Sequence, residues 1–233
     1  MMDPTKTGTV IRAGSHWVWQ ASGVRTQIRV VGRGPETQLE KIRSILCGSP
    51  RRVAYLRQIH SSKAVQACEG LCGAADALFT DRTDLAMAVA TADCLPIVLS
   101  GLHQSAVIHA GWRGLESEIV RRALSRLTGP TERVAAWIGP GIGPCCYEVG
   151  PDVAERVARS SSSGVVVHTD SGAIHLDLLK AARDQLEAEG VQEIESLPLC
   201  TYCEPRRLWS YRREGPGAGR NWTLAWRETP TER

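Results

Sequence analysis

The sequence predicts an α+β fold built on a largely antiparallel or mixed β-sheet. Short apolar, β-branched runs cluster in the middle of the chain and outnumber the helix-like segments. Strands and helices do not alternate as they would in a regular series of βαβ units. No linker or low-complexity tract divides the 233 residues, so one domain covering 1–233 is expected.

Most of the expected strands lie between residues 52 and 138. Each is a short apolar run bounded by turn-forming residues. They are Arg52 to Arg57, Ala77 to Thr80, Leu85 to Thr91, Leu95 to Leu99, Ser105 to His109 and Val134 to Ile138. Near the C-terminus, Leu208 to Tyr211 and Trp222 to Trp226 predict a hairpin around Gly215-Pro216-Gly217.

Two helices are expected from apolar residues at helical spacing. Glu116 to Leu127 places its apolar side chains on one face and is followed by Gly129-Pro130, a stop signal. His175 to Glu189 does the same, with Gly190 placed as a C-terminal cap. Asp152 to Ala158, which follows Pro151, predicts a third helix.

The composition is that of an ordinary soluble protein, with 42% hydrophobic and 23% charged residues. The net charge of +3 is weak, and no basic block interleaves with aromatics, so nucleic acid is not an expected partner. No segment is long and apolar enough to predict a membrane partner, and no protein partner is evident. A cytoplasmic location is expected, where the eight cysteines would be thiols or metal ligands rather than disulfides.

Three potential metal ligands lie at the ends of expected strands or in the turns between them. His60 follows YLRQI, Cys94 lies in TADCLPIVL, and His109 ends SAVIHA. A Cys/His/His set leaves one tetrahedral position open on zinc, as a catalytic zinc requires, and such a zinc lowers the pKa of a bound water. Without a metal, Cys94 and a histidine would be a nucleophile and its base. The gaps of 34 and 15 residues match no local spacing rule, so buried structural roles remain open for all three.

Charged residues near these three are further candidates. Asp93 precedes Cys94 and would orient a ligand or act as an acid or base; its alternative is a turn aspartate that binds its own backbone. Asp76 and Arg57 would face the same pocket or form surface ion pairs. Arg113 follows His109, and SYRREGPGAGR gathers arginines around a glycine turn that would hold phosphate or carboxylate: Arg212, Arg213 and Arg220.

The remaining cysteines lie in two unusual stretches. IGPGIGPCCYEVGPDV predicts a stiff loop that either offers backbone N–H groups to an anion or is a structural turn. Its neighbours Cys145 and Cys146 do not easily supply two ligands to one site. CTYC, Cys200 to Cys203, has zinc-ribbon spacing, and Cys68 and Cys72 are the only partner pair that the spacing suggests for a structural zinc site.

Together these stretches resemble the YfiH-like family, known also as the multicopper polyphenol oxidase or laccase-domain family, purine nucleoside phosphorylase and peptidoglycan editing factor. The resemblance covers about residues 50–226, and residues 1–50 diverge. It rests on these motifs in the family's order: QIH (Gln58–His60), DALFT (Asp76–Thr80), TADCLPIVL (Thr91–Leu99), HAGWRG (His109–Gly114), IGPGIGPCCYEVG (Ile138–Gly150), LDLLKAARDQL (Leu176–Leu186), CTYC and SYRREG…GR.

The resemblance implies a mixed-sheet sandwich with flanking helices, related to bacterial toxin-type cysteine–histidine folds. It implies a zinc site at His60, Cys94 and His109, with copper as the other metal. It also implies phosphorolysis of adenosine, inosine and methylthioadenosine, together with adenosine deamination. Purine nucleosides and phosphate are the expected partners, with Arg57, Arg113 and Arg212 as phosphate or substrate ligands.

The sequence departs from the family pattern at three places. Residues 9–50 are shorter than usual and lack the opening STRxGGVS-like and LNLG…GDD-like stretches. Ser61 stands where relatives often have glycine, and Glu214 replaces the usual aspartate of SYRRDG. These departures put the choice of substrate in question, but they leave the metal ligands in place.

Three other functions remain open. In a Cys–His hydrolase that edits peptidoglycan precursors, Cys94 would be the nucleophile and His109 the base. A copper phenol oxidase would use the same His₂Cys set, although multicopper enzymes need many histidines and this chain has six. A structural metal protein would hold the ion with no open position.

Overall fold

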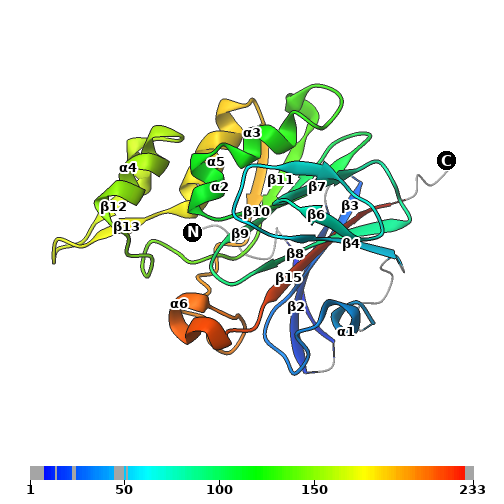
Figure 1. The fold of residues 1–233 in the computed structure, drawn as a ribbon, viewed down its shortest axis with the longest axis horizontal. Coiled ribbons are helices and arrows are strands. Elements are labelled where there is room, and N and C mark those ends of the chain that lie inside the picture. The colour runs from blue at the N-terminus through cyan, green and yellow to red at the C-terminus, as the bar shows by residue number, and fades with distance from the viewer. Residues whose placement is uncertain (1–7, 14, 23–24, 45–49, 51, 229–233) are drawn as a thin grey trace.

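The computed structural model describes residues 8–13, 15–22, 25–44, 50 and 52–228. Within them the chain forms two large β-sheets and a two-stranded ribbon, with helices on the outer sides (Figure 1). The α+β class and the mixed sheets predicted from the sequence are confirmed. None of the helices in the described part of the chain has the length and apolar character needed to span a bilayer.

The first sheet has seven strands and is mixed. At its centre β15 runs antiparallel to both β3 and β8, whereas β4 runs parallel to β8 and β6. In spatial order the strands are β1 (Thr9–Ala13), β2 (His16–Ser22), β3 (Thr26–Val31), β15 (Asn221–Arg227), β8 (Leu85–Thr91), β4 (Arg52–Arg57) and β6 (Gly70–Ala74).

The second sheet has six strands and holds the most continuously apolar ones. Strands β9 and β10 are buried along their whole length, as expected for strands covered on both faces. In spatial order the strands are β14 (Glu193–Ser196), β11 (Ala135–Ile138), β9 (Leu95–Ser100), β10 (Ser105–Ala110), β7 (Ala77–Thr80) and β5 (Ala64–Gln66). The small ribbon pairs β12 (Val166–His168) with β13 (Ile174–Leu176).

The helices cover the outer faces of the two sheets. Figure 1 shows α2 (Trp112–Glu116), α3 (Ile119–Leu124), α4 (Pro151–Arg159) and α5 (Leu178–Ala188) gathered on one side, and α1 (Leu39–Ser44) on the other. Leu115, Ile119 and Leu186 pack with the six-stranded sheet, while Leu39 and Ile42 pack with the seven-stranded one. A short helix, α6 (Tyr211–Glu214), and three 3₁₀ turns complete the described elements: Thr131–Arg133, Ser163–Val165 and Gly215–Gly217.

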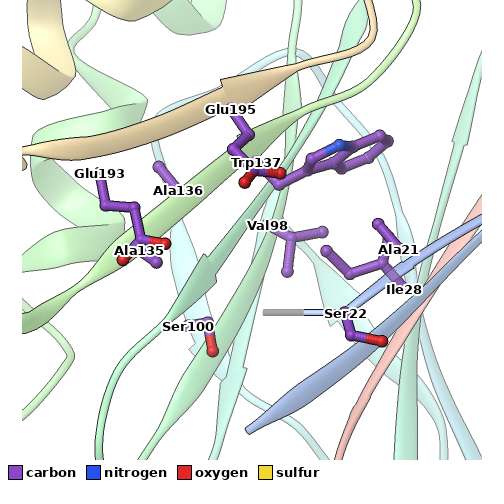
Figure 2. A pocket seen from close by; sticks show the side chains of 10 residues that line it. All are labelled: Ala21, Ser22, Ile28, Val98, Ser100, Ala135, Ala136, Trp137, Glu193 and Glu195. Carbon is purple, nitrogen blue, oxygen red and sulfur yellow. The ribbon is translucent and has the colours of Figure 1, made fainter. Parts of the chain in front are cut away.

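The inner faces of the two sheets pack against each other around two tryptophans. Trp19 of β2 stacks on Trp137 of β11 with ring centroids 4.7 Å apart. Met87 of β8 and Val107 of β10 belong to the same buried cluster. Figure 2 shows the small pocket beside this contact, where Trp137 extends toward Ala21. This packing of sheet on sheet produces the sandwich that the family resemblance implies.

The strands predicted between residues 52 and 138 are confirmed, but two predicted helices begin or end elsewhere. The expected helix Glu116 to Leu127 is instead two short helices, because Glu118 adopts a left-handed φ of 59° between them. The helix predicted from His175 begins at Leu178, since the Asp177 side chain caps it by accepting from the Lys180 N–H at 2.9 Å. Gly190 follows this helix with a φ of 86°, the conformation expected of its cap.

The predicted C-terminal hairpin is wrong. Leu208 to Ser210 form no strand, and β15 pairs instead with β3 and β8, which lie far away in the sequence. The two segments of the predicted hairpin do lie close together, but through a side chain. The Asn221 amide exchanges two hydrogen bonds of 2.9 Å with the backbone of Trp209. The three N-terminal strands were not predicted from the sequence; they pair consecutively as β1 with β2 and β2 with β3, before β3 pairs with β15.

Replacing Trp137 by alanine tests the sheet-to-sheet packing. The side chain is 4% exposed and stacks on Trp19, so we expect Trp137→Ala to lower the free energy of unfolding by about 3–5 kcal/mol. Leu71→Ala, at a side chain 56% exposed, is the control and should change it by less than about 0.5 kcal/mol. Urea unfolding curves measure both, and equal effects would contradict this account of the core.

Candidate functional site

The three candidate metal ligands meet where the chain passes from one sheet to the other. His60 lies in the turn after β4, Cys94 between β8 and β9, and His109 near the end of β10. Their ligand atoms all lie within 4.8 Å of one another, and Cys94 Sγ is 3.9 Å from His60 Nε2. One thiol and two imidazoles suit a borderline metal such as zinc or copper, so the donor set fits a metal ion.

Asp76 orients His109. This aspartate precedes β7, and its side chain is fully buried. Its Oδ1 lies 2.9 Å from His109 Nδ1, and its backbone carbonyl accepts from the His109 N–H at 2.7 Å. Because Asp76 occupies Nδ1, the other ring nitrogen of His109 is the one available to a metal, an arrangement common around histidine ligands.

The same carboxylate also fixes the turn that carries His60. The backbone N–H of His60 donates to Asp76 Oδ1 at 3.0 Å, and that of Ser61 donates to Oδ2 at 2.6 Å. The Ser61 hydroxyl adds a bond of 2.7 Å to Oδ2. These bonds hold His60 in a left-handed conformation, with φ at 57°, that brings its ring edge-on to the His109 ring.

The surroundings of Cys94 and His109 favour a thiolate beside an imidazolium. Burial opposes ionisation of Cys94, but hydrogen bonds from His109 and His60 outweigh it and lower the pKa of the thiol to about 6. Burial likewise opposes the charge on His109, yet its bonds to Asp76 and Cys94 raise the pKa of the imidazole to about 9. A thiolate at neutral pH is both a metal ligand and a nucleophile.

The trio opens into a pocket of about 580 Å³, within the size range of small-molecule sites. Aromatic and cationic side chains from the middle of the chain and from near its C-terminus form its walls. The residues that line it are Gln58, His60, Ala90, Ala92, Asp93, Cys94, His109, Trp112, Arg113, Tyr147, Tyr211, Arg212 and Arg220.

Two of the three predicted phosphate-binding arginines line this pocket, and one does not. Arg113 and Arg212 are wall residues, and Arg220 joins them from the glycine turn. Arg57 is exposed and does not line the pocket. It is the last residue of β4 and precedes the turn that carries His60. Arg213 has a structural role: it donates to the carbonyls of Thr201, Tyr202 and Leu208.

Asp93 lines the pocket, and both of its carboxylate oxygens already accept hydrogen bonds. Oδ1 accepts from the Thr201 hydroxyl at 2.6 Å and Oδ2 from the Arg212 N–H at 2.6 Å. Its backbone is left-handed, with φ at 94°, at the point where the chain leaves β8 for β9. Asp93 therefore joins the metal-ligand turn to the segments that carry the arginine wall.

The structure changes two expectations for the glycine-rich loop and the cysteines. Backbone N–H groups of the loop bind inside the protein rather than an anion: Ile142 donates to Asp93 O, and Tyr147 donates to Gly143 O. Cys72 Sγ exchanges hydrogen bonds with the Cys68 backbone, and neither residue is part of the group that contains Cys200 and Cys203. The suggested zinc site between these two pairs is thus wrong.

Several residues of the site were not predicted from the sequence. Tyr147, Trp112, Tyr211 and Gln58 line the pocket, yet nothing in their spacing distinguished them from core or surface residues. Gln58 stands beside His60 and uses its amide to continue the ladder of β8, exchanging bonds of 2.7 and 2.8 Å with the Ala90 backbone. Asp76, which the sequence analysis did name, is fully buried, and its partners are those that a buried carboxylate requires.

Gly111 is a direct test of the close packing around the trio. A Cβ atom at this position would lie 2.8 Å from Cys94 Sγ, too close for any side chain. We expect Gly111→Ala to displace the sulfur and to weaken metal binding at least tenfold. Gly217→Ala, where a Cβ would meet nothing within 4 Å, is the matched control. Competition with a chelator measures both, and an unchanged affinity in Gly111→Ala would contradict the geometry.

Asp76→Asn tests the orienting carboxylate. The amide offers one acceptor oxygen and turns its NH₂ group toward N–H donors, so both the His60 turn and the His109 ring lose their fixed positions. We expect metal affinity to fall about 10–100-fold. Asp84→Asn, at an exposed ion pair with Arg82, should leave the affinity unchanged. Equal affinities in the two variants would show that Asp76 does not position the ligands.

Comparison with known proteins finds relatives that match most of the chain. A protein of Xylella fastidiosa named purine nucleoside phosphorylase is 36% identical over 194 residues, which cover 78% of this chain and 74% of the relative. The purine nucleoside phosphorylase YfiH of Escherichia coli is 33% identical over 172 residues, covering 71% and 70%. These names are those of enzymes.

Solved structures show the same fold. A Neisseria meningitidis protein superposes with a TM-score of 0.82 at 29% identity, covering 93% of this chain and 100% of that one. YlmD from Geobacillus stearothermophilus superposes with a TM-score of 0.81 at 22% identity, covering 94% and 98%. The family model described as multi-copper polyphenol oxidoreductase laccase matches residues 36–228, and the chain belongs to this family.

Proposed function

We propose that the protein is a zinc-dependent purine nucleoside phosphorylase that acts on adenosine, inosine and methylthioadenosine and also deaminates adenosine. The observation that carries the proposal is the pocket itself, which joins a His/Cys/His metal set to three arginines and three aromatic rings. The names of the relatives support the same activity.

The wall residues suit the two substrates of phosphorolysis. Arg113, Arg212 and Arg220 present planar guanidinium groups, which bind phosphate oxygens in pairs. Arg212 donates from Nη1 to the carbonyl of Glu148, and Arg220 donates from Nη1 to the carbonyls of Ala218 and Gly219; a guanidinium has five N–H donors in all. Tyr211 presents an exposed ring against which a purine base can stack, beside Trp112 and Tyr147, whose rings lie under the Arg113 and Arg212 guanidinium groups.

Each residue then has a definite task. The arginines hold phosphate beside the anomeric carbon of the ribose, where it displaces the base. Asp93 keeps the Arg212 backbone in place, and Tyr147 stays protonated as a hydrogen-bond donor to the base, because burial raises its pKa to about 12. A bound zinc would supply Lewis-acid polarisation near His60, Cys94 and His109.

A chromatographic assay tests this function. Protein of known metal content is incubated with adenosine, inosine or methylthioadenosine, with and without phosphate. We expect phosphate-dependent release of the free base, inosine formed from adenosine, and loss of both activities in Cys94→Ala. Cys68→Ala, at an exposed thiol outside the pocket, is the control and should keep them. No turnover by the metal-loaded protein would refute the proposal.

The low pKa of Cys94 favours a second candidate, a Cys–His hydrolase acting on peptidoglycan precursors. In that enzyme Cys94 attacks an acyl carbon, and His109, held by Asp76, protonates the leaving group. Activity on such substrates that survives chelation would support the hydrolase over the phosphorylase. Copper-dependent phenol oxidation has less support, because only one of the two possible metal-binding groups among the described residues contains histidine.

A further inference from the structure

Four cysteines that the pocket does not use form a second cluster. Cys145 and Cys146 lie in the loop between β11 and α4, and Cys200 and Cys203 lie after β14. Their four sulfur atoms all lie within 4.8 Å of one another. Cys203 Sγ is 3.8 Å from Cys145 Sγ and 3.4 Å from Cys146 Sγ. The expectation that Cys145 and Cys146 would not share a site therefore does not hold, because the loop brings both sulfurs to the same group.

These spacings match a single tetrahedral ion. With zinc–sulfur bonds of about 2.3 Å, the sulfurs of a tetrahedral site stand about 3.8 Å apart. The turn that makes this possible is closed by the Cys146 N–H, which donates to Gly143 O at 3.0 Å. The Gly143 N–H in turn donates to Cys200 Sγ at 3.3 Å, as backbone donors do to metal-bound thiolates.

We propose that Cys145, Cys146, Cys200 and Cys203 bind one zinc ion as four thiolate ligands, in a structural site separate from the pocket. Four thiolates are the donor set of closed structural zinc sites and leave no position for substrate. The crowding of the sulfurs agrees with this assignment. Four thiolates packed this closely repel one another unless a divalent cation lies among them.

The ion would hold together two loops, one that carries a wall residue of the pocket and one that contacts another wall residue. Tyr147, which follows Cys146, lines the pocket. The Arg212 guanidinium lies over the Tyr147 ring, with its Cζ atom 5.1 Å from the ring centroid. Thr201, which follows Cys200, donates to the carboxylate of Asp93. Near the cysteines these two loops are also joined by the Thr201 N–H, which donates to Gly141 O at 3.0 Å, and by the Gly143 N–H, which donates to Cys200 Sγ. The site thus positions pocket residues without touching substrate.

The inference does not rest on the proposed function, and its test is independent of catalysis. Metal content is measured by mass spectrometry on the full-length protein purified under reducing conditions. In Cys94→Ala, which disables the pocket trio, we expect one zinc per chain, and X-ray absorption should find four sulfur ligands at about 2.3 Å. Nitrogen or oxygen ligands, or no metal, would overturn the proposal.

A second variant locates the ion. Cys94→Ala combined with Cys203→Ser should lose the remaining zinc, whereas Cys94→Ala combined with Cys68→Ser should retain it, because Cys68 lies outside the cluster. Zinc retained in the Cys203→Ser protein would overturn the assignment. A count of titratable thiols tests the alternative that two of the four cysteines form a disulfide. Two thiols fewer than the number of cysteines, in protein without metal, would refute the zinc site. If Cys203→Ser does not fold, the absorption spectrum of Cys94→Ala alone decides.

Discussion

One buried carboxylate holds the site together. Asp76 has no solvent-exposed surface, so its charge must be compensated inside the protein. It receives backbone donors from the turn at residues 59–61, the Ser61 hydroxyl and the His109 ring. These bonds keep the pKa of Asp76 low against the opposing effect of burial. Because the donors come from two metal-ligand segments, folding cannot satisfy Asp76 without also assembling the site.

The two sheets explain why the ligands meet at the edge of the sandwich. β4 and β8 belong to the seven-stranded sheet, whereas β9 and β10 belong to the six-stranded one. Cys94 lies where the chain crosses from one sheet to the other, and His60 and His109 approach it from either side. The left-handed residue Asp93 makes the crossing, and its carboxylate also secures the C-terminal arginine segment.

The departures from the family pattern have local partners. Ser61, in place of glycine, adds its hydroxyl to the bonds around Asp76. Glu214, in place of aspartate, forms ion pairs with Arg213 and with Arg33, which follows β3. The Arg33 guanidinium also lies 3.6 Å from the ring centroid of Trp209. The divergent N-terminal segment therefore contacts α6, the helix that carries Arg212, and stabilises this wall of the pocket.

The sequence by itself determined the α+β class and most central strands, and it singled out the three candidate ligands, because apolar runs, turn residues and unusual motifs are local signals. Its local patterns could not show that β15 pairs with β3 and β8, since strand partners are chosen by packing across the whole chain. The tertiary structure alone decided that Asp76 is buried against His109 and that Arg220 replaces Arg57 in the pocket. It also decided that CTYC meets the vicinal cysteines, not Cys68 and Cys72, because the approach of distant loops depends on how the two sheets stack.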